Sequence, residues 1–427
     1  MNIKSLAYSL ALSALSQVAL ADMADVSNNF ALTMLKSVSA QKSNQNVVIS
    51  PTSLNSAFLM VLAGAGKADQ ALVLKSLGYK NATIAEALED NKKFESGLVK
   101  SEGYSVSSQN ALFTNVSLDS QYKTLIENNL AAKTSTIDFS KSGASALINQ
   151  WADQSTQGMI KEIVKDKEIQ ELAFLGLNAT FLDAKWAYAK FDSPSEHGRD
   201  FLNEKGEVVG KVKLMVSNPK IRIAKKEYDK FTAYEVPYTL DDTGNAKGSM
   251  IVLLPKITNA EEYRKSMWSE NKIKPNIIPL SEVLESLTGE SISQMSKDLA
   301  ALRLEKNVRP LLFNMPKFKV ETEVGEELKT MVSNLGASSI FGNIDMSPMV
   351  ENNFKALWST SKIKLIKQKT VIEVGEEGTK AAAVSAIGGF PESCPPPSVV
   401  LNRPFAYLVK DNASGRIVFA GNFVAPN

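Results

Sequence analysis

The sequence predicts an α+β protein. Segments with helical spacing and segments with strand-like spacing both occur, but they do not alternate regularly as a doubly wound parallel sheet requires. The second half of the chain is richer in strand-like runs than the first half. No Pro- or Gly-rich linker divides the chain, so we expect residues 22–427 to form a single domain.

The first 21 residues have the pattern of a secretory signal peptide. Lys4 provides a short positive start, an apolar run interrupted by Ser follows, and Ala19-Leu20-Ala21 has the small-x-small pattern of a cleavage site. No later stretch reaches the roughly 20 apolar residues that a membrane span needs. We therefore expect a protein without a membrane anchor that is secreted, or periplasmic if the source is a Gram-negative bacterium.

Helical and extended segments follow one another through the first half. A short apolar run at residues 46–49 is closed by Ser50-Pro51, and the long apolar run at 172–181 predicts a central strand buried on both faces. Helical spacing predicts helices at residues 29–38, 54–65, 69–77, 145–156 and 160–164.

In the second half, apolar runs predict strands at residues 231–238, 249–254, 311–316 and 406–409. Residues 323–335 predict a helix closed by Gly336. Four Asn residues begin N-glycosylation motifs, and we expect Asn178 to be buried because it lies in an apolar run. These four residues are Asn81, Asn115, Asn178 and Asn412.

Composition and charge exclude several classes of function. The 427 residues include 44% hydrophobic and 22% charged residues, which is an ordinary globular balance. The 48 Lys and Arg residues against 46 Asp and Glu residues give a formal net charge of +2, so no basic footprint indicates nucleic acid. One Cys, Cys394, excludes an internal disulfide, and one His, His197, leaves little room for His-dependent catalysis. We expect no cofactor and no metal.

Residues 374–401 lack a clear helix or strand pattern. The segment begins with small, weakly polar residues and ends in Pro395-Pro396-Pro397, which cannot form a central strand. More than twenty residues without an element are uncommon inside a compact domain, and such loops are usually functional.

Six short motifs occur in an order that resembles the serpin family of serine protease inhibitors, and the resemblance covers nearly the whole mature chain. They are Asn46-Val47-Val48-Ile49-Ser50-Pro51-Thr52-Ser53-Leu54, Leu177-Asn178-Ala179-Thr180-Phe181 with Lys185-Trp186, Pro316-Lys317-Phe318, Leu335-Gly336, Glu376-Glu377-Gly378-Thr379 with the Ala run, and Asn402-Arg403-Pro404-Phe405.

This resemblance implies a large central mixed β-sheet with surrounding helices, smaller additional sheets and a long exposed reactive-centre loop at about residues 375–401. It implies a suicide-substrate inhibitor of a serine endopeptidase, not an enzyme. The protease cleaves the loop and forms an acyl-enzyme, and the freed loop then inserts into the main sheet as a strand. The implied partner is the target protease in a covalent complex, and we expect the inhibitor to be a monomer.

The resemblance places the hinge of the loop at Glu376, Glu377, Gly378, Thr379, Ala381, Ala382 and Ala383. In an inserted strand alternate side chains share one face, so the inward set would be Thr379, Ala381, Ala383, Ser385, Ile387 and Gly389. Five of these six side chains are small, which suits entry between two strands. Lys380, where the family often has Glu, would face solvent. An isolated Ala run also favours a helix, but the flanking glycines oppose one.

The position of the cleaved bond is less closely defined. Counting fifteen residues from Gly378 gives Glu392-Ser393, whereas counting back from the Asn402 motif gives Ser393-Cys394. Phe390 is a third candidate, although Pro391 after it resists most proteases. We favour Glu392-Ser393, which implies a glutamyl-specific target; cleavage after Ser393 implies an elastase-like one. Cys394 beside the bond is either an unreactive exposed thiol or a cross-linking one.

The resemblance also assigns supporting residues. Ser50, Ser53 and Asn178 match a buried hydrogen-bonded cluster beneath the opening of the sheet, where Gln368 takes the position at which the family often has His. Trp186 matches a Trp near the top of the sheet, where the loop first enters; plain core packing is compatible with that role.

A non-inhibitory carrier or chaperone on the same fold is the alternative function. Bulky or charged inward residues, or Pro, in the hinge would indicate it, and none occurs from Thr379 to Ser385. Lys92, Lys93 and Lys100 are interspersed with acids, which favours a solvated face over a heparin site.

Overall fold

The computed structural model describes residues 23–79, 82–98, 100–194, 198–305, 310–379 and 396–426. The predicted signal peptide at residues 1–21 lies outside the described residues. Across the described ranges, every helix is too short or too polar to span a bilayer. Also outside them are Asn81, His197, Ala381, Ala382, Ala383, Glu392, Ser393 and Cys394.

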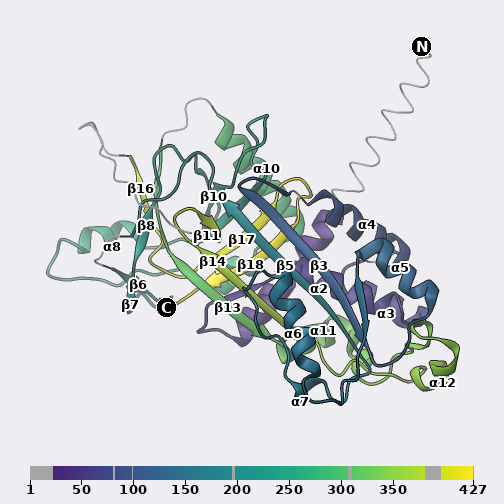
Figure 1. The fold of residues 1–427 in the computed structure, drawn as a ribbon. Helices are drawn as coiled ribbons and strands as arrows, with labels where there is room; N and C mark the ends of the chain where they lie inside the picture. Colours follow the sequence, from purple (N-terminus) through teal and green to yellow (C-terminus); the bar gives the residue numbers. More distant parts are fainter. Residues whose placement is uncertain are drawn as a thin grey trace, which may run out of the picture.

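The main sheet is seven-stranded among the described residues and runs through the centre of the molecule (Figure 1). Strands from distant parts of the chain form it, as expected for an α+β protein without regular βαβ units. In spatial order it contains β13 (Phe318–Val324), β14 (Gln368–Val374), β15 (Gly378–Thr379), β5 (Phe174–Lys185), β3 (Tyr104–Thr114) and β2 (Lys100–Ser101), and β4 (Lys133–Thr136) also pairs with β3.

Two long antiparallel pairs flank the short strand β15. β3 pairs with β5 along their whole overlap, and β13 pairs with β14 from Phe318 opposite Val374 to Val324 opposite Gln368. β15 is antiparallel to both β14 and β5, so those two strands run parallel to each other. Among the described residues no ladder joins β14 directly to β5.

The strand predicted at residues 172–181 is confirmed as β5, but the prediction of burial on both faces is wrong. Burial alternates along most of β5: Leu175, Leu177 and Ala179 are buried, whereas the residues between them are only partly buried. Leu175 and Leu177 share a core cluster with Ile148 and Ala152 on one face, whereas Gly176 lies against Val61 on the other, so both faces are covered and the second is less completely buried.

A six-stranded sheet packs behind the main sheet. All residues of β10, β11, β17 and β18 are buried, so these strands form the most interior layer. They confirm the strands predicted at residues 231–238, 249–254 and 406–409, although the first of them ends at Pro237. In spatial order the sheet contains β1 (Val47–Ile49), β18 (Ile417–Phe423), β17 (Phe405–Asp411), β11 (Gly248–Pro255), β10 (Phe231–Pro237) and β9 (Ala224–Glu227).

Two smaller sheets complete the β structure of the described residues. A three-stranded sheet contains β16 (Ser398–Val400), β12 (Leu312–Pro316) and β8 (Leu214–Val216), and a hairpin contains β6 (Arg199–Leu202) and β7 (Val208–Val212). β12 confirms the strand predicted at residues 311–316. β16 begins three residues after the undescribed part of the loop and pairs in parallel with β12.

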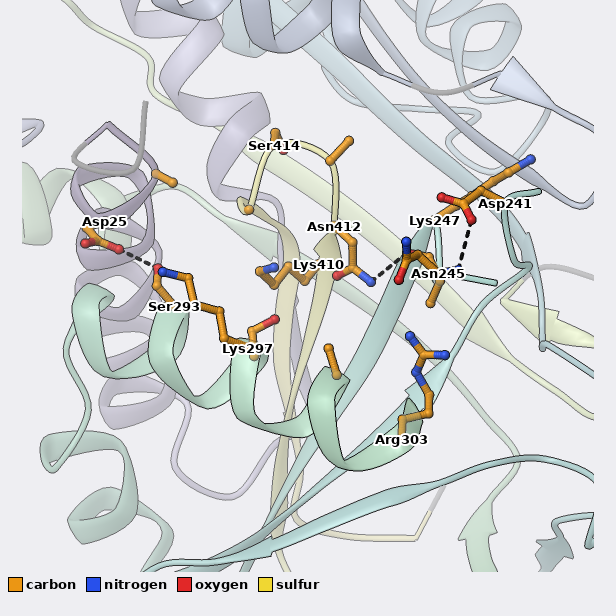
Figure 2. A pocket seen from close by; sticks show the side chains of 16 residues that line it. Asp25, Asp241, Asn245, Lys247, Ser293, Lys297, Arg303, Lys410, Asn412 and Ser414 are labelled. Carbon is orange, nitrogen blue, oxygen red and sulfur yellow. Dashed lines mark hydrogen bonds between the residues drawn. The ribbon is translucent and has the colours of Figure 1, made fainter. Parts of the chain in front are cut away.

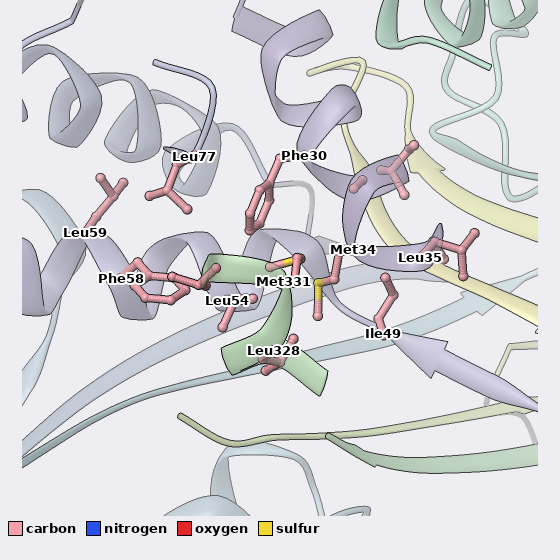
Figure 3. Close-up of a cluster of buried hydrophobic side chains, with 14 of the residues drawn as sticks. Phe30, Met34, Leu35, Ile49, Leu54, Phe58, Leu59, Leu77, Leu328 and Met331 are labelled. Carbon is pink, nitrogen blue, oxygen red and sulfur yellow. The ribbon is translucent and has the colours of Figure 1, made fainter. Parts of the chain in front are cut away.

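Helix α2 (Pro51–Leu62) lies between the two large sheets. Pro51 occupies its first turn, where the missing N–H is not needed. Eleven of its twelve residues are buried, and its buried polar side chains Ser53, Asn55 and Ser56 each form a hydrogen bond. Leu54 and Phe58 of α2 meet side chains of the helix at residues 23–41 and of α11 (Glu326–Val332) in the largest core cluster (Figure 3).

The remaining helices cover the outside of the sheets. The helices predicted at residues 29–38, 54–65, 69–77 and 145–156 are confirmed, with shifts of a few residues at their ends. The bounds are α3 (Lys67–Ser76), α4 (Ile84–Gly97), α5 (Ser120–Leu130), α6 (Ala144–Ser155), α7 (Asp166–Ile169), α8 (Ala260–Ser266), α9 (Leu280–Glu285), α10 (Gly289–Leu304) and α12 (Lys355–Trp358).

Two helix predictions need correction. Residues 160–164 are irregular, because the Asn149 side chain accepts from the N–H groups of Ile163 and Val164 and donates to the Val164 carbonyl. These side-chain bonds replace the backbone bonds of a helix. In the segment 323–335 only Glu326–Val332 is an α-helix, since Glu323 and Val324 end β13. A wider turn follows and contains Gly336 at φ 92°.

Candidate functional site

The chain reverses direction at the end of β14, at residues 375–379, which we call the hinge site. The Gly375 N–H donates to the Gly378 carbonyl at 2.8 Å, and the Gly378 N–H donates back at 3.3 Å. After this turn Thr379 lies opposite Val374 of β14 and opposite Ala184 of β5. The hinge site therefore begins a strand between two strands of the main sheet.

Gly378 is required where the chain passes closest to β5. A Cβ atom at this position would overlap the carbonyl oxygen of Ala184, and the backbone of Lys185 is also close. Since that obstacle is backbone, it cannot move aside as a flexible side chain would. Only glycine allows this approach, so the sequence pattern Gly378-Thr379 fixes where the new strand starts.

Thr379 is buried and makes a hydroxyl contact deep in the molecule. Its Oγ1 lies 2.7 Å from the hydroxyl oxygen of Tyr238, which directly follows β10 and is itself fully buried. Burial raises the pKa of Tyr238 far above its ordinary value, so the phenol keeps its proton. The Tyr238 ring stacks on Trp186 with ring centres 4.7 Å apart.

Trp186 and its neighbours hold the backbone of the turn. The indole N–H donates to the Gly375 carbonyl at 2.9 Å, and the Trp186 backbone N–H donates to the Glu377 carbonyl at 2.9 Å. The Phe191 N–H donates to the Glu376 carbonyl at 2.8 Å. Three successive carbonyls of the hinge site are thus satisfied by the segment that follows β5.

Two ion pairs clamp the acidic residues of the hinge site. Lys317 lies 3.0 Å from Glu376, whose side chain is only 8% exposed, whereas that of Lys317 is 46% exposed. Lys190 lies 3.3 Å from Glu377, and both side chains are about a quarter exposed. Because a buried carboxylate needs a partner, the Glu376 pair is the more important of the two.

A second polar cluster lies where β14 begins. Gln368, the first residue of β14, accepts from the Ser50 N–H at 3.1 Å and donates to the Ser50 carbonyl at 2.7 Å. The Ser50 hydroxyl donates to the Val418 carbonyl in β18. The Ser53 hydroxyl donates to the Asn178 carbonyl in β5 at 3.1 Å. The start of α2 thus bonds to both strands that flank β15.

Asn178 is only partly buried, so the prediction that it is buried is wrong. It donates to Ser108 Oγ at 2.8 Å and to Asn110 Oδ1 at 2.9 Å, both in β3. Ser50, Ser53, Gln368 and Asn178 therefore lie together, but Asn178 is bonded to Ser53 through its backbone carbonyl and not through its side-chain amide.

Glu95, near the end of α4, was missed by the sequence analysis. Its carboxylate accepts from Ser56 of α2 at 3.1 Å, and from Ser108 and Asn110 of β3 at 3.3 and 3.1 Å. Burial raises the pKa of Glu95, and these hydrogen bonds oppose the rise. Helical spacing could have indicated it, because Glu95 lies four residues after Asn91 and therefore on the same buried face of α4.

The arrangement can act mechanically on a strand. Its groups donate hydrogen bonds to three backbone carbonyls, bury one hydroxyl pair and form ion pairs with two carboxylates, and together they fix the start of the strand in position. Within the described ranges no group of His, Cys, Asp and Glu is placed to hold a metal ion. Glu392 and Ser393 lie outside the described residues, so the structure gives no geometry for the predicted bond.

Comparisons with known proteins agree on one family. The family model described as serpin (serine protease inhibitor) matches residues 25–426. Iripin-5 from Ixodes ricinus is 27% identical over 415 residues, which cover 94% of each chain.

Solved structures show the same α+β fold. Thyroxine-binding globulin in complex with thyroxine superposes with a TM-score of 0.75 at 19% identity, covering 95% of this chain and all of that one. The thermophilic serpin tengpin in its native state gives 0.75 at 22% identity, covering 94% of this chain and 93% of that one. Together with the family model, these matches establish that the chain belongs to the serpin family.

Proposed function

We propose that this serpin inhibits a serine endopeptidase by inserting its cleaved loop into the main sheet. The observation that carries the proposal is the position of Thr379, which is buried between β14 and β5 and paired with both. A strand that continues from Thr379 in the same direction runs antiparallel to two neighbours that are parallel to each other. Such a strand finds hydrogen-bond partners on both sides.

The sequence after Thr379 supports the same proposal. The inward positions Ala381, Ala383 and Ser385 are small, so they add little volume to the space between the two strands. About 15 residues at roughly 3.3 Å each span about 50 Å, enough to carry an attached protease across the molecule. Insertion of a serpin loop is an established example of order change and of released strain.

The proposed covalent step is ordinary acyl transfer. The protease serine oxygen attacks the carbonyl carbon of Glu392, and the bond to the Ser393 nitrogen breaks. The protease base returns the serine proton to the leaving Ser393 amine, and Glu392 stays attached as an ester. Insertion then separates the ester from the new amino end and stops hydrolysis. Glu392 suits a glutamyl-specific target, and cleavage after Ser393 suits an elastase-like one.

The test is incubation of the purified protein with a trypsin-like, an elastase-like and a glutamyl-specific protease. We expect an SDS-stable complex with the glutamyl-specific or the elastase-like enzyme, and mass spectrometry of the released fragment locates the cut. In the control variant Glu392→Ala, a complex that depends on cleavage after Glu392 disappears. Cleaved product without complex for every protease favours the alternative, a non-inhibitory carrier or chaperone on the same fold.

A further inference from the structure

Three apolar side chains are exposed together in the segment that follows α8. Trp268 is 91% exposed, Met267 is 54% exposed and Ile273 is 41% exposed. We call these three residues the apolar tip. α8 lies at one end of the molecule, away from the main sheet, and α12 lies at the other end (Figure 1). Single exposed apolar residues are normal on a protein surface, but a cluster of them indicates contact with something other than water.

The backbone of the apolar tip is held in place by hydrogen bonds to its own base. The buried Ser266 hydroxyl donates to the Tyr263 carbonyl at 2.8 Å and accepts from the Ile273 N–H at 3.2 Å. The Asn259 side chain accepts from the Asn276 N–H at 2.7 Å. These bonds fold the chain back, so Ile273 lies beside the end of α8. The three apolar side chains are therefore presented together before any partner binds.

The apolar tip differs in kind from the polar surface at the end of the six-stranded sheet, which Figure 2 shows. There Ser293 donates to Asp25, and the Asn412 side chain donates to the Ala246 carbonyl. Such groups need a partner of matching geometry. The hydrophobic effect has no direction, so the apolar tip is stabilised by any medium that removes it from water.

The charges beside the apolar tip nearly cancel. Residues 260–274 contain three acidic and four basic side chains, which gives a formal charge of +1. Lys265 lies 2.7 Å from Glu261, and Lys274 lies 3.0 Å from Glu207. Local charge thus selects neither a strongly acidic nor a strongly basic partner. The long basic side chains can keep their ammonium groups in water while their neighbours enter an apolar medium.

The area of the apolar tip is too small for a stable protein partner. A Trp side chain buries at most about 250 Å², and Met267 and Ile273 are only partly exposed. A stable protein interface buries roughly 800 Å² on each partner. A lipid surface needs no complementary shape, and Trp is enriched where lipid meets water. The small area and the lack of strong charge therefore favour a lipid surface over a second protein.

We propose that the apolar tip inserts into the surface of an uncharged lipid bilayer, while the charged side chains around it stay in water. The contact is peripheral, since every helix in the described ranges is too short or too polar to cross a bilayer. It is weak and reversible, because only three side chains leave water. It uses no residue of the hinge site, so it does not depend on protease inhibition.

Vesicles of phosphatidylcholine, which has no net charge, test the proposal. Tryptophan emission moves to shorter wavelength when the ring leaves water, and Trp268 is the reporter because Trp151, Trp186 and Trp358 are buried or partly buried. We expect a blue shift that saturates as lipid is added, and flotation of the protein with the vesicles. Raising NaCl to about 0.5 M should leave binding unchanged, because salt screens charges and does not weaken apolar burial.

Variants of exposed residues separate insertion from folding. Trp268→Ser should abolish the blue shift and weaken binding in flotation at least about tenfold. Met267→Lys keeps the reporter and places a charge in the apolar tip, so it should weaken binding too. The matched control is Leu357→Ser, since Leu357 is 76% exposed in α12, and it should bind like the unmodified protein. All three variants should melt at the temperature of the unmodified protein.

Four results would overturn the proposal. The first is equal vesicle binding by Trp268→Ser and the unmodified protein, and the second is no binding by a correctly folded unmodified protein. The third is binding that disappears at high salt, which indicates attraction between charges. The fourth is a blue shift without lipid that grows with protein concentration, which indicates that a second copy of the chain covers the apolar tip.

Discussion

The hydroxyl oxygens of Thr379 and Tyr238 lie 2.7 Å apart in the buried interior, although 141 positions separate the two residues in the chain. Tyr238 directly follows β10 of the six-stranded sheet, and Thr379 ends β15 of the main sheet. The contact therefore joins the two sheets at the point where the loop leaves the described structure. It holds the first residue of the new strand in place before any cleavage.

Replacing Tyr238 by Phe should loosen the hinge site. The variant keeps the ring stacked on Trp186 but removes one member of the hydroxyl pair, which costs about 1 kcal/mol. Local opening should become roughly fivefold more frequent, and hydrogen exchange at the Gly378 amide should accelerate by that factor. Tyr188→Phe is the control, because Tyr188 is 44% exposed and should give no change. Unchanged exchange in Tyr238→Phe contradicts this role.

Replacing Thr379 by Arg should turn the inhibitor into a substrate. Thr379 is already buried at the start of the strand, so Arg at this position either keeps an unpaired charge out of water or leaves the sheet, and either outcome disfavours insertion. Insertion then becomes slower than hydrolysis of the acyl-enzyme, and cleaved product should replace the SDS-stable complex. Thr379→Ser keeps the hydroxyl group and should still form the complex. If Thr379→Arg traps protease as well as the unmodified protein, the proposed inward position of residue 379 is wrong.

The ion pair of Glu376 and Lys317 should contribute more to stability than the exposed ion pair of Glu373 and Lys319 in the neighbouring strands. Glu376→Lys places two cations together at a nearly buried site and should lower the free energy of unfolding by up to about 3 kcal/mol. Exchanging both residues, Lys317→Glu with Glu376→Lys, should recover part of the loss. Urea unfolding measures all three proteins.

The matched control for that pair is Glu373→Lys, since Glu373 and Lys319 form an ion pair at 3.6 Å with side chains 42% and 58% exposed. An exposed pair contributes less than about 1 kcal/mol, so this change should have a small effect. Equal losses at Glu373 and Glu376 contradict the argument from burial.

Glu95 should make stability depend on pH in an unusual direction for a carboxylate. Its pKa is raised in the folded protein, so the folded state binds its proton more tightly than the unfolded state does. Its contribution to stability is present below the ordinary value of 4.5 and is lost as the pH rises through the raised pKa.

The variant Glu95→Gln removes the charge and keeps an acceptor for Ser56 and Ser108. It should therefore be more stable than the unmodified protein at pH 7, and the difference should vanish below pH 4.5. Thermal unfolding between pH 4 and 8 measures this. Glu89→Gln on the exposed face of α4 is the control, and its stability relative to the unmodified protein should not change with pH in this way. A constant difference at all pH values contradicts the raised pKa.

Elements with strong local patterns could be predicted from the sequence. The strand at β5 follows from its long apolar run, and α2 follows from helical spacing after Ser50-Pro51. Residues 160–164 were predicted incorrectly, because the side chain of Asn149, remote from them in sequence, takes their backbone hydrogen bonds. Local spacing contains no information about such a partner.

The hinge site was only partly predictable for the same reason. Gly378 and Thr379 could be selected by resemblance, and the position of Trp186 followed from its motif. Tyr238, Lys190 and Lys317 could not be assigned to it, since only the packing of distant strands brings them to residues 375–379.

The melting temperature of the protein before and after a single cut within residues 380–395 tests the central claim most directly. The cut is made by a protease that is not trapped, and the two fragments are kept associated under native conditions. If the segment from Thr379 joins the main sheet as a full strand, the cleaved protein melts at a clearly higher temperature, and the Thr379→Arg variant shows no such rise. A cleaved protein that melts at the same or a lower temperature than the intact one contradicts the account.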